Sequence, residues 1–209
     1  MESAREGLER LREGNLRFAA SVRGADAIPM HLRRAELAGG QSPFAIILGC
    51  SDSRVPAEIV FDQGLGDLFV IRVAGNIVAP SQVGSVEFAA ERFGTRLVVV
   101  LGHSTCGAIL ATLDELRSPG GKQSRNLRSI VDRIRPSVEG LFATDLRDDP
   151  EALVRAAVRA NIRASVDHLR HGSEVLERLI AHDGLLVAGA EYSLESGLVE
   201  VFDDPAGGA

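Results

Sequence analysis

Two short apolar runs in this chain each lead into side chains that can bind a metal. The first run, 44–49, is followed by Cys50–Val55, and the second, 97–102, is followed by His103–Gly107. Both runs are rich in branched aliphatic residues and are not interrupted by polar ones, which is typical of a parallel strand covered on both faces. Ligands of open α/β sheets bind outside the carboxyl ends of such strands. We therefore expect both polar segments to meet at one edge of a parallel sheet.

Cys50, His103 and Cys106 together form a Cys₂His set suited to zinc. The chain has two cysteines, both in these segments, and two cysteines do not make a disulfide framework. His103 and Cys106 are three residues apart at a strand–helix junction, so both side chains can face one side. Two thiolates, a neutral imidazole and Zn²⁺ sum to zero charge. A water on such an ion should ionise above the roughly pH 7 known for zinc sites of this kind.

Asp52 follows Cys50 by two residues, where it can fill the fourth zinc position or stand beside it. Arg54 is the nearest cation, and guanidinium pairs with carboxylate in a bidentate manner. We predict that an Asp52–Arg54 pair leaves zinc open to water and that Asp52 accepts the hydrogen of zinc-bound hydroxide. Core packing of the cysteines and a structural zinc closed by Asp52 are the alternatives. A phosphate loop over Gly102–Gly107 is a weak match because the following Lys-Ser/Thr pair is absent.

The composition restricts the partners of the chain. Its net charge is −6 and it has no tryptophan, which argues against binding to nucleic acid or to anionic membranes. The first residues alternate in charge and lack an apolar signal core. No apolar run approaches the roughly 20 residues that span a bilayer. We therefore expect a cytoplasmic protein with neither nucleic-acid nor membrane partners.

The order of the predicted elements favours an α/β fold with a central, mostly parallel β-sheet flanked by helices. The 209 residues fit a single domain, with an N-terminal helical arm over 1–40 and a flexible tail over 203–209. Strands are expected at 44–48, 68–73, 97–101 and 185–190, with an edge strand within 192–202. Helices are expected at 2–20, 29–40, 55–60, 81–93, 105–116, 126–135, 150–170 and 173–183, with Ser81 and Ser173 as N-caps.

The helix at 2–20 is expected to be only loosely amphipathic. Gly7 and Gly14 should break it, and its apolar side is thin for a core helix. Two arrangements remain open at this point. The helix can pack as an arm on a partner subunit, or it can lie at the periphery of its own domain.

The segments Cys50–Val55 and His103–Gly107 together resemble the two motifs of the β-class carbonic anhydrases, and the resemblance extends over most of the chain. It implies four parallel strands with an extra antiparallel edge strand, assembled as dimers or larger homo-oligomers. It also implies attack of zinc hydroxide on CO₂ to give bicarbonate. The resemblance assigns zinc binding to Cys50, His103 and Cys106, and the catalytic dyad to Asp52 and Arg54.

The same resemblance implies a substrate site and a subtype. Gln41, nine residues before Cys50, matches the plant-like type, whose site is always open, and its amide can donate a hydrogen bond to a CO₂ or bicarbonate oxygen. The type that closes when Asp binds zinc has a tryptophan where this chain has Ile47. Phe69 matches an apolar wall of the substrate pocket. Phe88, also assigned to this pocket, stands where relatives often have tyrosine.

Gly107 completes the residues assigned to the substrate. A departure from the family pattern lies at 72–76, where many relatives have Arg-Asn-Val-Ala-Asn and this chain has Arg-Val-Ala-Gly-Asn. The nearest rival function is hydrolysis of carbonyl sulfide or carbon disulfide on the same fold. A non-catalytic, zinc-stabilised interaction module is a second rival, which the presence of Asp52 and Arg54 disfavours. A nucleotide-binding module lacks its glycine fingerprint.

Overall fold

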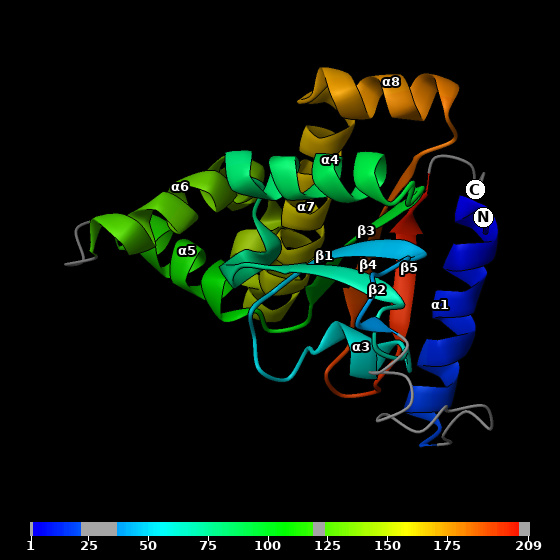
Figure 1. Ribbon diagram of the computed structural model, residues 1–209. Helices are drawn as coiled ribbons and strands as arrows, with labels where there is room; N and C mark the ends of the chain where they lie inside the picture. The colour runs from blue at the N-terminus through cyan, green and yellow to red at the C-terminus, as the bar shows by residue number, and fades with distance from the viewer. Residues whose placement is uncertain (1, 22–36, 119–123, 205–209) are drawn as a thin grey trace.

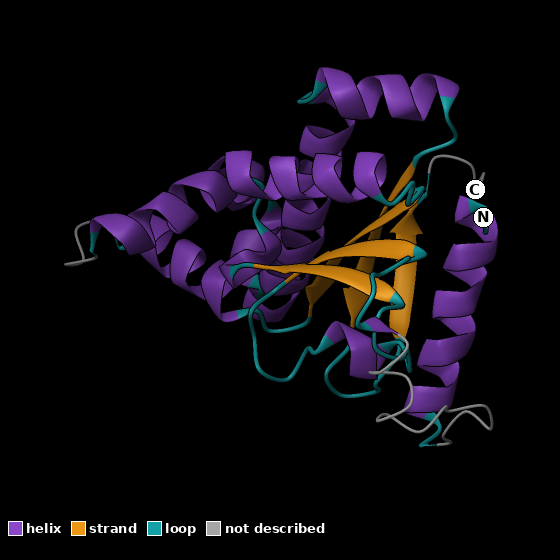
Figure 2. Ribbon diagram, viewed as in Figure 1, coloured by secondary structure: helices purple, strands orange, loops and turns teal. Residues whose placement is uncertain are grey.

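The computed structural model describes residues 2–21, 37–118 and 124–204 and has a five-stranded sheet at its centre (Figures 1 and 2). The strand order is β2-β1-β3-β4-β5; the first four strands run parallel and β5 is antiparallel to β4. This arrangement confirms the predicted fold class. The strands are β1 Ala45–Gly49, β2 Leu68–Arg72, β3 Leu97–His103, β4 Leu186–Tyr192 and β5 Val199–Asp203.

Helices connect the strands and cover both faces of the sheet (Figure 2). Short 3-10 helices are labelled η. The expected helix at 29–40 falls largely outside the described residues. The helices are α1 Ala4–Ala19, α3 Ala57–Val60, η1 Ala74–Asn76, α4 Pro80–Arg92, α5 Gly107–Arg117, α6 Arg125–Val138, η2 Glu139–Ala143, η3 Asp145–Asp148, α7 Pro150–His171 and α8 Glu174–His182.

The sheet separates two apolar layers, because alternate residues of each strand point to opposite faces. Ile46 and Leu48 of β1 pack with residues of α4 to α8, whereas Ala45 and Ile47 pack with residues of α1 and α3. Every residue of β1 and β3 is buried. The uninterrupted apolar runs in the sequence are therefore explained by cover on both faces.

Helix α1 is continuous through both of its early glycines, so the predicted breaks are wrong. Gly7 and Gly14 are buried, and they allow α1 to approach the rest of the chain closely. A Cβ atom on Gly14 would lie 1.9 Å from the carbonyl oxygen of Phe61. Leu8 and Leu11 are each only 2% exposed against the sheet of their own chain. The glycines thus serve helix packing rather than helix termination.

Three predicted boundaries near the site need correction. Strand β3 extends to His103 because its ladder with β4 continues to the pair His103–Tyr192. Helix α4 begins at Pro80, whose missing N–H costs nothing there, and Ser81 does not cap it. Helix α5 begins at Gly107 because Thr105 has φ +52°, outside the helical region.

The start of the predicted flexible tail is ordered. Asp203 belongs to β5, and its carboxylate lies 3.0 Å from Nη1 of Arg170. Asp204 accepts two hydrogen bonds from Arg5 of α1, at 2.6 and 3.0 Å. These ion pairs hold the end of the described chain beside α1, next to the N-terminus in Figure 1. Residues 205–209 lie outside the described part. No described helix has the length and apolar character needed to cross a bilayer.

Candidate metal centre

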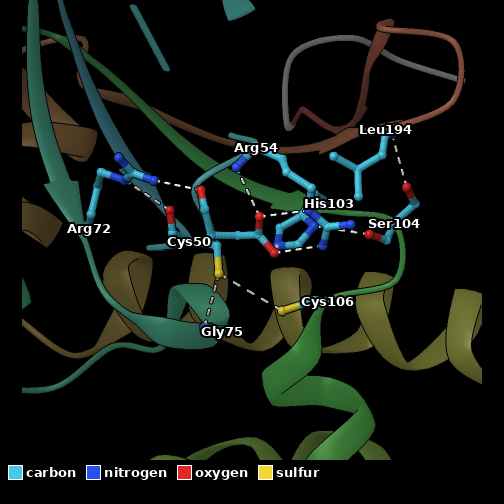
Figure 3. A network of polar contacts seen from close by, with 9 residues as sticks. Cys50, Arg54, Arg72, Gly75, His103, Ser104, Cys106 and Leu194 are labelled. Carbon is cyan, nitrogen blue, oxygen red and sulfur yellow. Dashed lines mark hydrogen bonds and ion pairs between the residues drawn. The ribbon is translucent and has the colours of Figure 1, made fainter. Parts of the chain in front are cut away.

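The three predicted metal ligands come together at the carboxyl ends of β1 and β3 (Figure 3). Cys50 directly follows β1, His103 is the last residue of β3, and Cys106 is the N-cap of α5. Their ligand atoms all lie within 4.8 Å of one another, and the two sulfurs are 4.0 Å apart. All three residues are buried. The structure therefore assembles a compact Cys₂His group that can hold a metal ion.

The His103 ring is oriented for a metal. Its Nδ1 lies 2.9 Å from the backbone oxygen of Ser104, and because a carbonyl only accepts, Nδ1 carries the proton. The lone pair is then on Nε2, which is buried without a hydrogen-bond partner among the described residues. A buried polar atom without a partner is costly. A metal ion held here would satisfy this nitrogen, and a carbonyl on the other ring nitrogen is the usual companion of a histidine ligand.

The two thiols have unequal proton affinities. The hydrogen bond shared with the Cys106 sulfur, followed by smaller contributions from His103 and from the backbone N–H groups of Gly75 and Asp52, lowers the pKa of Cys50 to about 4 in spite of burial. The neighbouring Cys50 thiolate and burial raise the pKa of Cys106. Metal binding must displace this second proton, since thiolates are the metal ligands.

Asp52 and Arg54 form a bidentate ion pair beside the three ligands. Arg54 donates from Nε to Oδ1 at 2.9 Å and from Nη2 to Oδ2 at 2.7 Å, and its backbone N–H adds a bond to Oδ1 at 3.0 Å. These donors hold the pKa of the Asp52 carboxyl well below its usual range. Oδ2 of Asp52 lies 3.9 Å from Nε2 of His103. The carboxylate is thus ionised and adjacent to the ligand group, with Arg54 as its partner.

Arg72 shapes the loop that carries these residues, a role that the sequence analysis did not assign. Its guanidinium donates to the backbone oxygen of Cys50 at 3.0 Å and to that of Asp52 at 2.7 Å (Figure 3). Ser104 connects the segment after β3 to the segment after β4, because its hydroxyl accepts a hydrogen bond from the Leu194 N–H at 3.0 Å. An arginine at the end of the apolar strand β2 is the one signal that could have indicated such a role.

Gly107 is the one predicted substrate residue that lies at this centre. It is exposed at the start of α5, directly after Cys106, and a Cβ atom placed on it would meet nothing within 4 Å. The space beside Gly107, the residue next to the proposed ligand Cys106, is therefore open.

The structure does not bring Gln41, Phe69 and Phe88 to the metal centre of their own chain. Gln41 is exposed and precedes β1, whereas Cys50 follows it. Phe69 is paired with Ile46, at the opposite end of the strands from the ligands. Phe69 and Phe88 instead lie together, with ring centroids 6.3 Å apart. Phe88 is 53% exposed, whereas Phe69 is half-buried against the core.

Comparisons with known proteins agree with the geometry. A sequence-family model described as carbonic anhydrase matches residues 45–199. The chain is 40% identical to carbonic anhydrase 2 of Mycobacterium tuberculosis, over 90% of this chain and 87% of that protein. It is 33% identical to a carbonic anhydrase of Pseudomonas aeruginosa, over 91% of this chain and 86% of that protein.

Solved structures share the fold. A tetrameric β-carbonic anhydrase of Sordaria macrospora matches with a TM-score of 0.72 and 27% identity, over 81% of this chain and 85% of that one. The β-carbonic anhydrase CafA of Aspergillus fumigatus matches with a TM-score of 0.72 and 30% identity, over 83% and 82% of the two chains. The chain therefore belongs to the β-class carbonic anhydrases, enzymes whose two motifs its sequence carries.

Proposed function

We propose that this enzyme catalyses the reversible hydration of CO₂ to bicarbonate and a proton, with zinc held by Cys50, His103 and Cys106. The observation that carries the proposal is a buried Cys₂His group within 4.8 Å beside a carboxylate already engaged by an arginine. Bound zinc would supply the Lewis acid that lowers the pKa of a water. The described residues supply orientation and exclude competing ligands.

Asp52 and Arg54 act as the dyad in this proposal. Because Arg54 engages both carboxylate oxygens, Asp52 is kept from completing the ligand set. Its lowered pKa keeps it a hydrogen-bond acceptor throughout the physiological range. Asp52 accepts a hydrogen bond from the attacking water and so directs the lone pair of that water toward the carbon of CO₂.

We further propose that the working enzyme is a homo-oligomer in which a second copy completes the substrate pocket. Gln41, Phe69 and Phe88 lie away from the metal ligands of their own chain, and the exposed Phe88 ring is available to another copy. An apolar wall suits CO₂, which has no net dipole, and the Gln41 amide suits an oxygen of CO₂ or bicarbonate. The tetrameric relative from Sordaria macrospora supports assembly.

Stopped-flow CO₂ hydration by zinc-loaded protein, scanned from pH 6.5 to 9, tests the function. We expect activity that rises through one ionisation, without the cooperative loss in bicarbonate expected of a closing site. Activity at no pH with stoichiometric zinc would refute CO₂ hydration. Carbonyl sulfide and carbon disulfide would then be tested as substrates of the same site.

Arg54→Ala tests the dyad in the same assay. We expect activity to be abolished while zinc remains bound, because Asp52 is released to bind the metal. Arg17→Ala is the matched control, since Arg17 pairs with Asp62 at 2.7 Å on the surface and away from the ligands. Normal turnover of Arg54→Ala would refute the role of the ion pair.

A further inference from the structure

Two buried polar residues interrupt the apolar face of α7. Asn161 and Ser165 are 2% and 5% exposed and are four residues apart, so they lie on the same side of the helix. The Asn161 amide donates to the backbone oxygen of Gly75 at 2.8 Å, and the Ser165 hydroxyl donates to that of Asn76 at 3.0 Å. Two consecutive carbonyls of the short helix η1 are thus held from α7.

The η1 turn has a backbone that needs such support. Gly75 has φ +71° and Asn76 has φ +43°; the left-handed region is open to glycine and costs energy for other residues, although asparagine tolerates it better than most. The N–H of Gly75 donates to the sulfur of Cys50 at 3.4 Å (Figure 3). One peptide turn therefore connects the α7 side chains to a proposed metal ligand.

Close packing of α7 on the sheet sets the distance over which these side chains must reach. A Cβ atom on Gly102 of β3 would lie 2.5 Å from Ile162, and one on Gly189 of β4 would lie 3.0 Å from the same residue. Both glycines therefore let α7 lie directly on β3 and β4. Asn161, next to Ile162, is placed at the turn by this contact.

We propose that Asn161 and Ser165 are positioning residues for the metal centre, fixing η1 so that the Gly75 N–H points at the Cys50 sulfur. This inference rests on the proposed zinc site. A hydrogen bond to a metal-bound thiolate withdraws electron density from sulfur and leaves more positive charge on the metal. Asn161 and Ser165 touch neither metal nor substrate, and they act through the backbone of the turn.

Cobalt(II) substitution gives a readout that does not depend on activity. For Asn161→Ala and Ser165→Ala we expect the sulfur-to-cobalt charge-transfer band to move to longer wavelength, because the thiolate loses its hydrogen bond. We also expect cobalt affinity to fall about tenfold, as is usual for loss of an outer-shell partner. Amide exchange at Gly75 should become faster. Asn161 and Ser165 both line a cavity of about 510 Å³, so truncating either side chain enlarges a cavity that is already present.

Asn15→Ala is the matched control. Asn15 is as buried as Asn161, and its amide bonds to Val60, Gly197 and Val199 rather than to η1. The control should lower the stability of the protein and leave the cobalt spectrum, the cobalt affinity and the Gly75 exchange rate unchanged.

The outcomes separate this inference from the proposed function. Wild-type protein that gives no thiolate–cobalt band would overturn the metal site itself. A normal wild-type band, with both α7 variants behaving like Asn15→Ala, would overturn the positioning role alone. If Asn161→Ala does not fold, Ser165→Ala tests the positioning role alone. This variant removes only one hydroxyl, and its cobalt spectrum, cobalt affinity and Gly75 exchange rate are compared with those of Asn15→Ala in the same way.

Discussion

Replacing Gly14 by alanine sets two physical effects against each other. In the interior of an exposed helix, glycine to alanine is stabilising by about 1 kcal/mol, because alanine has the higher helix propensity. Gly14, however, lies where α1 meets the end of α3, and a Cβ atom there would be 1.9 Å from the Phe61 carbonyl oxygen. We predict that the contact outweighs the propensity and that the substitution destabilises the protein.

The structure gives the size of the effect. Contacts under 3.0 Å are not tolerated, so α1 must move away by roughly 1 Å. Asn15, the next residue, then loses much of three hydrogen bonds of 3.1, 2.9 and 2.7 Å. Each such bond contributes about 0.5–1.5 kcal/mol. After subtracting the helix-propensity gain, we expect a net loss of about 2 kcal/mol.

Urea unfolding followed by circular dichroism measures this loss. The measurement needs chelated protein at fixed concentration, because metal binding and assembly both add to apparent stability. Gly84→Ala is the control: it lies within α4, its Cβ would meet nothing within 4 Å, and it should stabilise by about 0.5–1 kcal/mol. A Gly14→Ala protein as stable as wild type would refute the reasoning about close approach.

Three further predictions concern the metal centre. Gly75→Ala places a Cβ atom on a backbone with φ +71°, 2.9 Å from side-chain atoms of Ala108 and Ile134. We expect this variant to lose most of its zinc on dialysis. Retention of one zinc per chain would contradict the prediction. Asp52→Asn should destabilise chelated protein at pH 7. Arg54 lowers the pKa of the folded Asp52 carboxyl. The stability that Asp52 contributes is therefore complete above about pH 4, the unfolded pKa, and is lost as the pH falls through the lower folded pKa. The unfolding midpoints of the variant and the wild type should thus converge in acid. Zinc removal should lower the thermal midpoint of wild type and leave that of Cys50→Ser nearly unchanged.

The strands and the ligand group were predictable because both depend on local sequence. An uninterrupted run such as 97–102 has few structures open to it other than a strand buried on both faces, and parallel strands bring their carboxyl ends to one edge. His103 and Cys106 lie three residues apart at a single strand–helix junction, so local sequence alone predicts that they lie close together. Cys50 then had to arrive from a neighbouring strand, as the observed β1–β3 pairing shows.

The errors arose where the deciding contact is with a residue far away in the chain. Gly14 looks like a helix breaker from propensity alone, and the Phe61 carbonyl that demands a glycine is 47 residues away. The end of β3 at His103 depends on Tyr192 of the neighbouring strand. Asp204 is ordered by Arg5, at the other end of the chain. No local pattern contains this information.

Gln41 and Phe69 illustrate a different limit. The family resemblance associates them with substrate, but it does not say whether that substrate site belongs to the same chain or to another copy. Their separation from Cys50 along β1 and β2 is consistent with the proposed homo-oligomer, in which another copy of the chain supplies them. The sequence motif and the single-chain geometry together therefore argue for assembly more strongly than either does alone.

Asn161 and Ser165 were missed because α7 reads as an ordinary amphipathic helix with a few polar residues. Yet a polar side chain on a buried helical face is expensive unless it has a partner, and a pair spaced by four residues implies partners that are themselves adjacent. Here the partners are consecutive carbonyls of η1, whose own N–H points at Cys50. The strand ends can bring the ligands together, but the hydrogen bond on the sulfur depends on a helix about 90 residues further along the chain. The reactivity of the centre is therefore a property of the packed domain, beyond the two motifs that reveal its existence.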